Sequence, residues 1–325
     1  MHFVENILPS ADRPRKWTVI LVSVAISTLL TVWGIYEIGQ YGIALFILTP
    51  LFMGMVPAIL YGQGREVSKK QARNLAFASL ALFTVGLVVF ALEGLICIAM
   101  AAPFGLLFSW VGSLMGWALV YKTPAQSPGA ALLLLIAIPL TAFIEKPNSG
   151  QTLIQATTSV DINADIQTVW KNVVEFPELS EPTEALFKVG IAYPISADID
   201  GKGVGAIRNC NFSTGSFVEP ITVWNEPNLL AFDVVENPEP MKELSFWDID
   251  APHLHDYFVS KRGQFNLIQL PNGQVRLEGT TWYKHDIRPE FYWRLWSDYI
   301  IHSIHDRVLG HIKECSEKET TTYNN

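Results

Sequence analysis

Five long apolar stretches occupy the first 146 residues, and they restrict the possible fold more than any other feature. A helix that crosses the hydrocarbon core of a bilayer, about 30 Å thick, needs roughly 20 apolar residues. We therefore predict membrane-spanning helices at residues 17–38, 41–61, 75 to about 100, 104–121 and 130–144.

The basic residues of this half predict its orientation, because loops rich in Lys and Arg stay in the cytoplasm. The residues before the first stretch are Arg13, Arg15 and Lys16. Those between the second and third stretches are Arg65, Lys69, Lys70 and Arg73, and Lys122 lies between the fourth and fifth. We expect a cytoplasmic N-terminus and, after five crossings, an extracytoplasmic C-terminal half, periplasmic if the bilayer is a bacterial inner membrane. The fifth stretch is short and contains Pro139; a re-entrant fifth helix would instead leave the C-terminal half in the cytoplasm.

The two halves of the chain differ in charge. Residues 1–146 carry nine Lys/Arg and six Asp/Glu, whereas residues 147–325 carry fourteen and twenty-five. An acidic C-terminal half argues against nucleic acid as a partner, since phosphate binding requires clustered basic side chains. Cys97, Cys210 and Cys315 show neither CxxC nor zinc spacing, and we expect no cofactor.

We divide the chain into a cytoplasmic segment at residues 1–16, a transmembrane domain at 17–146, a linker at 147–151, a C-terminal domain at 152–316 and a disordered tail at 317–325.

Within the apolar half, Glu93, Cys97 and Met100 are spaced to share one face of a helix. Carboxylates inside a membrane are candidates for function, and a thiol with a thioether would suit a soft metal such as Cu(I). The alternative is an interfacial Glu93 followed by a helix break at Gly94, with Cys97 and Met100 serving only as packing residues.

The C-terminal half has the pattern of an α+β domain. A strand from residue 152 and a helix capped by Asn163 precede a series of strands at residues 191–199, 203–212, 216–224, 229–235, 257–270 and 274–286. Asn272-Gly273 is typical of a tight hairpin turn. We predict an antiparallel meander crossed by a long helix from Pro289 to about Cys315.

Three stretches carry a resemblance to a known family: "VDINADIQTVWKNVVEF", "STGSFVEPITVWNEPNLLAFDV" and "GQFNLIQLPNGQVRLEGTTWYKHDIRPEFYWRLWSDYIIHSIHDRVLGHI". Together with the order of elements, they make residues 152–315 resemble the START-like or SRPBCC superfamily, and they look like bacterial members with an N-terminal membrane domain. The resemblance implies a helix-grip fold, a curved sheet gripping its last helix around a hydrophobic cavity. It does not name the ligand, because the superfamily includes polyketide cyclases as well as lipid-transfer proteins.

One stripe of the predicted last helix holds the main candidate site. At about 100° per residue, the residues that share this stripe are Phe291, Arg294, Asp298, His302, His305 and Leu309. Asp298, His302 and His305 have three interpretations: metal ligands, together with His253, His255 and Asp256; an acid/base group in which Asp298 orients His302; or hydrogen-bonding residues at the edge of the core.

Aromatic residues elsewhere complete the predicted ligand-binding set. Phe246 and Trp247 lie in a proline-containing link at residues 236–256, which we interpret as a lid, a membrane contact or a packed loop. Trp282 belongs to a strand and, as the larger of adjacent side chains, is predicted to line the cavity.

The leading functional hypothesis is a membrane-tethered module that binds or transfers a hydrophobic, lipid-like molecule, with the bilayer and that molecule as partners. A cyclase or hydrolase that uses the cavity histidines is the first alternative. A signalling or protein-interaction module is the second.

Overall fold

The computed structural model describes residues 8–39, 41–122, 127–145, 153–249, 251–255 and 257–323, and the chain forms two compact units. The helical unit comprises Met1–Asn148, Glu243–Pro252 and Ile287–Glu290. The α+β unit comprises Ser149–Lys242, His253–Asp286 and Phe291–Asn325. The linker predicted at residues 147–151 lies outside the described residues.

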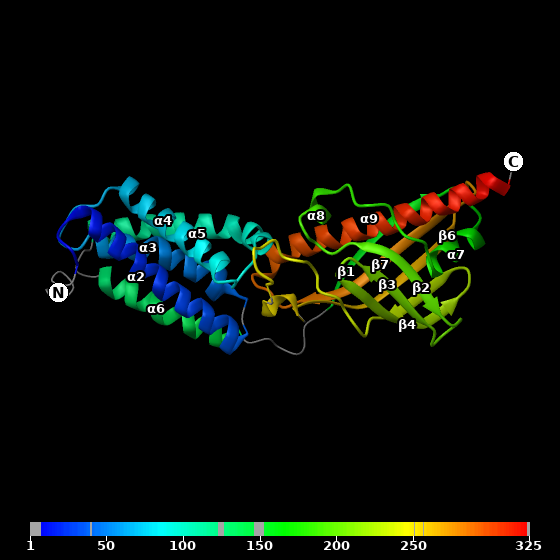
Figure 1. Ribbon diagram of the computed structural model, residues 1–325, viewed down its shortest axis with the longest axis horizontal. Helices are drawn as coiled ribbons and strands as arrows, with labels where there is room; N and C mark the ends of the chain where they lie inside the picture. Colours follow the sequence, from blue (N-terminus) through cyan, green and yellow to red (C-terminus); the bar gives the residue numbers. More distant parts are fainter. Residues whose placement is uncertain are drawn as a thin grey trace. The chain divides into compact units, whose positions relative to one another are not determined.

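The helical unit is built from the predicted apolar stretches (Figure 1). Its helices are α2 (Asp12–Trp33), extended by a π-helical turn (Gly34–Ile38); α3 (Thr49–Tyr61), preceded by a second such turn (Ala44–Leu48); α4 (Lys69–Val89); α5 (Leu95–Lys122); and α6 (Ser127–Ile144). Four of them are long and apolar enough to cross a membrane, and α6 is apolar but shorter.

The third and fourth helices do not have the predicted boundaries. The chain breaks between α4 and α5 at residues 90–94, not near Pro103, which lies inside α5. The break is held by Glu243, whose carboxylate accepts hydrogen bonds from the amides of Ile96 and Cys97, at 3.0 and 3.1 Å. A carboxylate at a helix N-terminus satisfies free amides and complements the helix dipole. Gly94 permits this approach, because a β-carbon there would overlap the Glu243 side chain.

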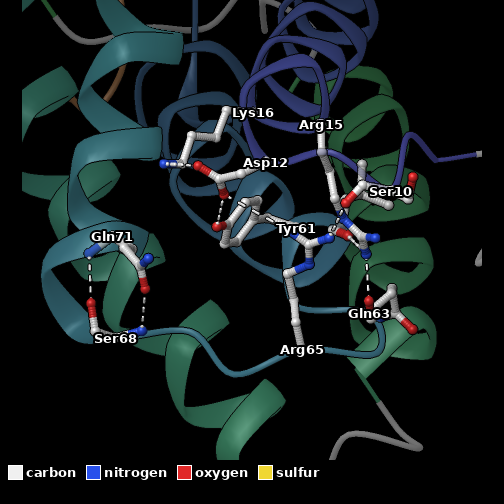
Figure 2. A network of polar contacts seen from close by, with 10 residues as sticks. Ser10, Asp12, Arg15, Lys16, Tyr61, Gln63, Arg65, Ser68 and Gln71 are labelled. Atoms are coloured by element: carbon white, nitrogen blue, oxygen red, sulfur yellow. Dashed lines mark hydrogen bonds and ion pairs between the residues drawn. The ribbon is translucent and has the colours of Figure 1, made fainter.

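Polar contacts join the first turn of α2 to the end of α3 (Figure 2). Asp12 accepts a hydrogen bond from the Tyr61 hydroxyl and pairs with Lys16 at 2.7 Å, while Arg65 lies 3.7 Å from the same carboxylate. Arg15 is buried and donates to the backbone oxygens of Leu60 and Gln63. Ser68 and Gln71 form a capping box that starts α4. This end of the helical unit therefore holds the basic residues at the start of α2 and those from Arg65 into the start of α4.

Helix α6 runs from near this basic end to the opposite end of the unit. Leu134, Ile138 and Ala142 pack in one cluster with residues of α3. At the end of α6, Glu145 accepts hydrogen bonds from the amides of Ile43 and Ala44, at 3.1 and 3.4 Å, just beyond the end of the first helix. A helix of 18 residues spans about 27 Å, close to the thickness of the hydrocarbon core.

The α+β unit is a seven-stranded antiparallel sheet with a long C-terminal helix, α9 (Glu290–Tyr323), along it (Figure 1). The strands are β1 (Ile154–Ile162), β2 (Pro194–Asp200), β3 (Ile207–Phe212), β4 (Gly215–Asn225), β5 (Leu229–Asp233), β6 (Phe258–Gln269) and β7 (Val275–His285), in the order β1-β7-β6-β5-β4-β3-β2. Between β1 and β2 lie α7 (Ile166–Val174) and the short α8 (Ala185–Lys188). This arrangement is the predicted helix-grip fold, with the meander and crossing helix confirmed.

The core of this unit lies between the sheet and its helices. Val308, Leu309 and Ile312 of α9 are buried against Leu277 and Trp170, among others. These positions recur at the spacing of one helical face, so α9 contributes a continuous apolar stripe to the sheet.

Two local predictions need correction. The cap of α7 is Asp165 rather than Asn163, because the Asp165 carboxylate accepts hydrogen bonds from the amides of Gln167 and Thr168. The tail predicted from residue 317 continues α9 as far as Tyr323.

The longer helix has identifiable contacts. Glu317 pairs with Lys313 on α9 and accepts a hydrogen bond from the Asn163 amide, and Ser316 is buried against the Asn172 side chain. The helix end was predicted from the apolar repeat alone, whereas these polar contacts lie beyond that repeat and stabilise the last turns of α9.

We expect Leu309→Ala to lower the free energy of unfolding of the α+β unit by about 2–5 kcal/mol, the cost of a buried leucine truncation. Phe291→Ala is the matched control: Phe291 lies on the same predicted stripe but is 70% exposed, so its loss should cost less than about 0.5 kcal/mol. Hydrogen exchange at the β7 amides of the full chain measures both. Equal effects of the two substitutions would contradict this packing of α9.

Candidate functional site

A cavity of about 110 Å³ opens in the α+β unit between α9 and strands β3 to β7. Its lining is mostly apolar, and five aromatic rings contribute to it: Phe212, Phe217, Phe232, Phe258 and Phe265. Ile301, Ile304, Val308 and Leu309 close it from α9. A largely apolar cavity with a few converging polar groups is the usual form of a small-molecule site.

Two glycines keep space free between the sheet and the helix. Gly279 of β7 faces Leu309, and a β-carbon there would lie 3.4 Å from a Leu309 methyl group. Gly263 of β6 lies beneath Phe232, whose ring a β-carbon would approach to 2.6 Å. Substitution at Gly263 would displace the Phe232 ring, and at Gly279 it would fill the space that Leu309 borders.

An ion pair between Arg208 and Glu219 is the most polar part of the lining. The two residues are direct partners on β3 and β4, and their side chains are almost completely buried. Arg208 Nη1 donates to Glu219, and Nε donates to the Val174 carbonyl at 3.1 Å. Arg208 Nη2 is buried and has no hydrogen-bond partner. Because a buried donor without an acceptor is costly, this atom needs an explanation.

Aromatic rings surround the same guanidinium group. Its central carbon lies 5.6 Å from the ring centres of Phe176, Phe232 and Phe265. Rings at this distance attract a cation through their negative faces. The positive charge is thus held by one carboxylate and three rings in a buried position.

Cys210 follows Arg208 on the same side of β3 and also lines the cavity. Burial raises the pKa of its thiol to about 12, so the group is a neutral thiol at physiological pH. A thiol in this state is a poor nucleophile.

His305 is the residue of the predicted trio that lines the cavity. Its Nε2 lies 2.8 Å from the Thr281 hydroxyl and its Nδ1 lies 3.1 Å from the Thr158 hydroxyl. His302 Nδ1 lies 2.7 Å from the same Thr158 hydroxyl. Burial, with a smaller contribution from His302, lowers the pKa of His305 to about 4. At neutral pH the imidazole is uncharged, and both of its nitrogens have hydroxyl partners.

Asp298 does not orient His302 in the structure. Its carboxylate accepts a hydrogen bond of 2.6 Å from the Tyr283 hydroxyl and pairs with Arg294 at 3.4 Å. The structure therefore divides the trio into an Asp298–Tyr283 contact and a His302–Thr158–His305 contact. Neither half matches the acid/base arrangement predicted from helix spacing.

The other predicted ligand-binding residues are not part of the cavity lining. Trp282 faces the opposite side of the sheet from Thr281 and stacks with Arg262, whose guanidinium is 4.8 Å from its ring. Phe291 and Arg294 are exposed on α9. Phe246, 92% exposed, and Trp247 belong to the helical unit.

The proposed metal ligands do not come together. His302 and His305 bond to Thr158, and His253 and His255 lie in or next to a 3-10 turn at Pro252–Leu254. Among the described residues, no cluster of potential ligands includes His255, His302 or His305, and Asp256 lies outside those residues.

The intramembrane candidates have a different placement from the one predicted. Glu93 lies in the turn before α5, whereas Cys97 and Met100 belong to its first two turns. The three residues therefore do not lie on one continuous helix, but the Glu93 carboxylate and the Cys97 thiol do lie within 4.8 Å of each other. The break before Leu95 matches the alternative prediction of a helix interruption at Gly94.

Sequence reasoning missed Arg208 and Glu219 as site residues. A signal was present: Arg208, Cys210 and Phe212 alternate on one side of β3, so an inward Phe212 implies an inward Arg208. Its partner depends on the pairing of β3 with β4, which the sequence pattern does not specify.

No family model matches the chain, and no curated protein matches it. Several solved structures resemble it over about half its length. The Zhui aromatase/cyclase from Streptomyces sp. R1128 is 8% identical, with 52% of this chain and 96% of that one covered and a TM-score of 0.35. Norcoclaurine synthase from Thalictrum flavum is 13% identical, with 53% of this chain and 99% of that one covered and a TM-score of 0.33. A protein from Nitrosospira multiformis is 15% identical, with 52% of this chain and 99% of that one covered and a TM-score of 0.34. At this identity, function has to be argued from the cavity itself.

We expect the stability of the α+β unit to fall as the pH decreases from about 6.5 towards 4. Native His305 has a pKa of about 4, below its ordinary value of 6.5, so the unfolded chain binds the proton more readily in this range. The loss attributable to this residue should be on the order of 2 kcal/mol by pH 4.5.

His305→Gln, which retains hydrogen-bonding groups but does not titrate, should show a shallower pH dependence than the wild type. Thermal unfolding of the full chain between pH 7 and 4.5 compares the two. Identical slopes would show that His305 is not neutral and buried as described.

Proposed function

We propose that this protein binds a small apolar molecule, or one end of a larger one, in the cavity between α9 and the sheet. The observation that carries the proposal is the cavity lining, in which aromatic and aliphatic side chains surround a few polar groups. For comparison, an apolar cavity of about 150 Å³ binds benzene. The 110 Å³ here is suitable for a single small ring or the end of a chain and is too small to enclose a whole lipid.

Binding is favoured over catalysis by the state of the histidines. A general base needs an available nitrogen and a pKa near the working pH. His305 has hydroxyl groups at both nitrogens and a pKa of about 4, and His302 is not part of the lining. These groups hold the edge of the cavity in place, as in the structural interpretation of the trio.

To test binding, the full chain is purified in detergent and its bound apolar compounds are extracted and measured by mass spectrometry. Ile304→Trp should reduce the bound compound severalfold, because Ile304 lines the cavity and the indole would fill it. Tyr299→Trp places the same ring on an exposed position of α9 and should leave the amount unchanged. If Ile304→Trp retains the wild-type amount, the compound lies elsewhere and the proposal is wrong.

We also propose that the helical unit tethers this domain to a membrane, with the N-terminus in the cytoplasm. The basic residues gather at the end where α2 starts and α3 stops, whereas Glu145, at the end of α6, bonds to amides at the other end. This placement supports a complete crossing by α6 over a re-entrant one. In a bacterial inner membrane, the α+β unit would then be periplasmic.

The segment Glu243–Pro252 is suited to the membrane boundary on that side. The Leu244 carbonyl accepts a hydrogen bond of 3.1 Å from the Leu95 amide at the start of α5, and Phe246 and Trp247 are exposed nearby in sequence. Aromatic side chains favour the interface between hydrocarbon and water. We propose that they contact the bilayer surface rather than cover the cavity.

Cysteines placed at Glu66 and Lys202 test the orientation in intact cells with a membrane-impermeant thiol reagent. Both positions are exposed, one before α4 and one in the α+β unit. Peptide mass spectrometry should find the label at position 202 and not at 66, separately from the three native cysteines. Label at neither position, as a re-entrant α6 would give, or at position 66 alone would place the α+β unit in the cytoplasm and leave the binding proposal intact.

A further inference from the structure

The buried guanidinium of Arg208 has a hydrogen-bond donor that is not used within the protein. The guanidinium is 1% exposed, lines the cavity, and uses its Nη1 and Nε groups on Glu219 and the Val174 carbonyl. Only Nη2 lacks a partner. A donor held in this way, on a side chain fixed at two other points, is prepared for an acceptor atom that enters the cavity.

The charges of the lining restrict what that acceptor can be. Arg208 and Glu219 neutralise each other, and His305 is uncharged at neutral pH. Arg262 of β6 is also part of the lining, but its guanidinium lies against the ring of Trp282, at 4.8 Å, and Trp282 does not line the cavity. An anionic ligand would add an uncompensated negative charge next to Glu219, in surroundings where burial of an unpaired charge is costly.

We propose that the cavity binds an uncharged apolar molecule with a hydrogen-bond acceptor, of which a ketone carbonyl is the simplest form, and that Arg208 Nη2 donates to this acceptor. The inference rests on the proposed function, because it assigns the polar contact within the same cavity. The rings of Phe232 and Phe265, which lie beside the guanidinium, would pack against the apolar part of the ligand.

Three probes of similar size separate the contributions of apolar contact, the carbonyl acceptor and charge to the binding affinity. Acetophenone has a carbonyl, ethylbenzene has none, and benzoate is charged. Their dissociation constants are measured by equilibrium dialysis against the full chain in nanodiscs, with empty nanodiscs correcting for partition into lipid. The double variant Arg208→Met/Glu219→Leu removes the donor without leaving a buried charge. Replacing a buried ion pair by apolar residues is often neutral or stabilising, so this variant should fold.

In the wild type, benzoate should bind at least tenfold more weakly than acetophenone. In the double variant, the affinity for acetophenone should fall relative to that for ethylbenzene by roughly tenfold or more, as expected for the loss of a hydrogen bond to a charged donor. Ethylbenzene should still bind the double variant, which reports that the cavity is intact, so the ratio of the two affinities is the readout.

An unchanged ratio of acetophenone to ethylbenzene affinity in the double variant would overturn the role of Arg208 while leaving apolar binding in place. Benzoate binding more tightly than acetophenone would overturn the uncharged ligand class. If ethylbenzene and acetophenone both bind the wild type no better than they bind Ile304→Trp, the proposed function fails, and this inference fails with it.

Discussion

The packing of α9 on the sheet is the interaction on which the α+β unit depends. The helix supplies Val308, Leu309 and Ile312 to the core that covers the inward side of the sheet, next to residues of α7 such as Trp170. The fit is incomplete where Gly279 faces Leu309, and the cavity lies in this region. Core and site are consequently parts of one interface, so a residue such as Leu309 both stabilises the fold and borders the cavity.

The Arg208–Glu219 pair adds polarity to this interface at an energetic cost. Two buried charges lose hydration, and their attraction offsets that loss only with good geometry and further hydrogen bonds. Here the Val174 carbonyl and three aromatic rings provide part of the compensation. The pair is not needed to fill space, since apolar side chains would do so with less loss of hydration. Its position in the cavity lining is better explained by a ligand that uses the remaining donor.

Carboxylates perform a corresponding task in the helical unit, where they hold the ends of helices. Glu145 bonds to amides at the start of the segment before α3, and Glu243 bonds to those at the start of α5. Glu145 lies at the end of α6 and Glu243 lies between β5 and β6, and each satisfies amides that would otherwise lack acceptors. Through Glu243, a segment that follows five strands of the sheet becomes part of the helical unit.

Much of the architecture followed from the sequence alone, because it depends on local patterns. Apolar runs of membrane length identified the helical half, alternation and the Asn272-Gly273 turn identified the strands and their meander, and the charges of the loops indicated an orientation. The predictions that failed concern features that depend on residues distant in the chain. The α4–α5 break is held by Glu243, and the inward choice of Thr281 over Trp282 follows from strand pairing, where a shift of one residue reverses every side chain. Helix spacing correctly placed His305 and Leu309 on one face. Only the tertiary structure decided which part of that face meets the sheet, and only it brought Arg208 next to Glu219. Both depend on the register of the strands, which no local pattern in the sequence encodes.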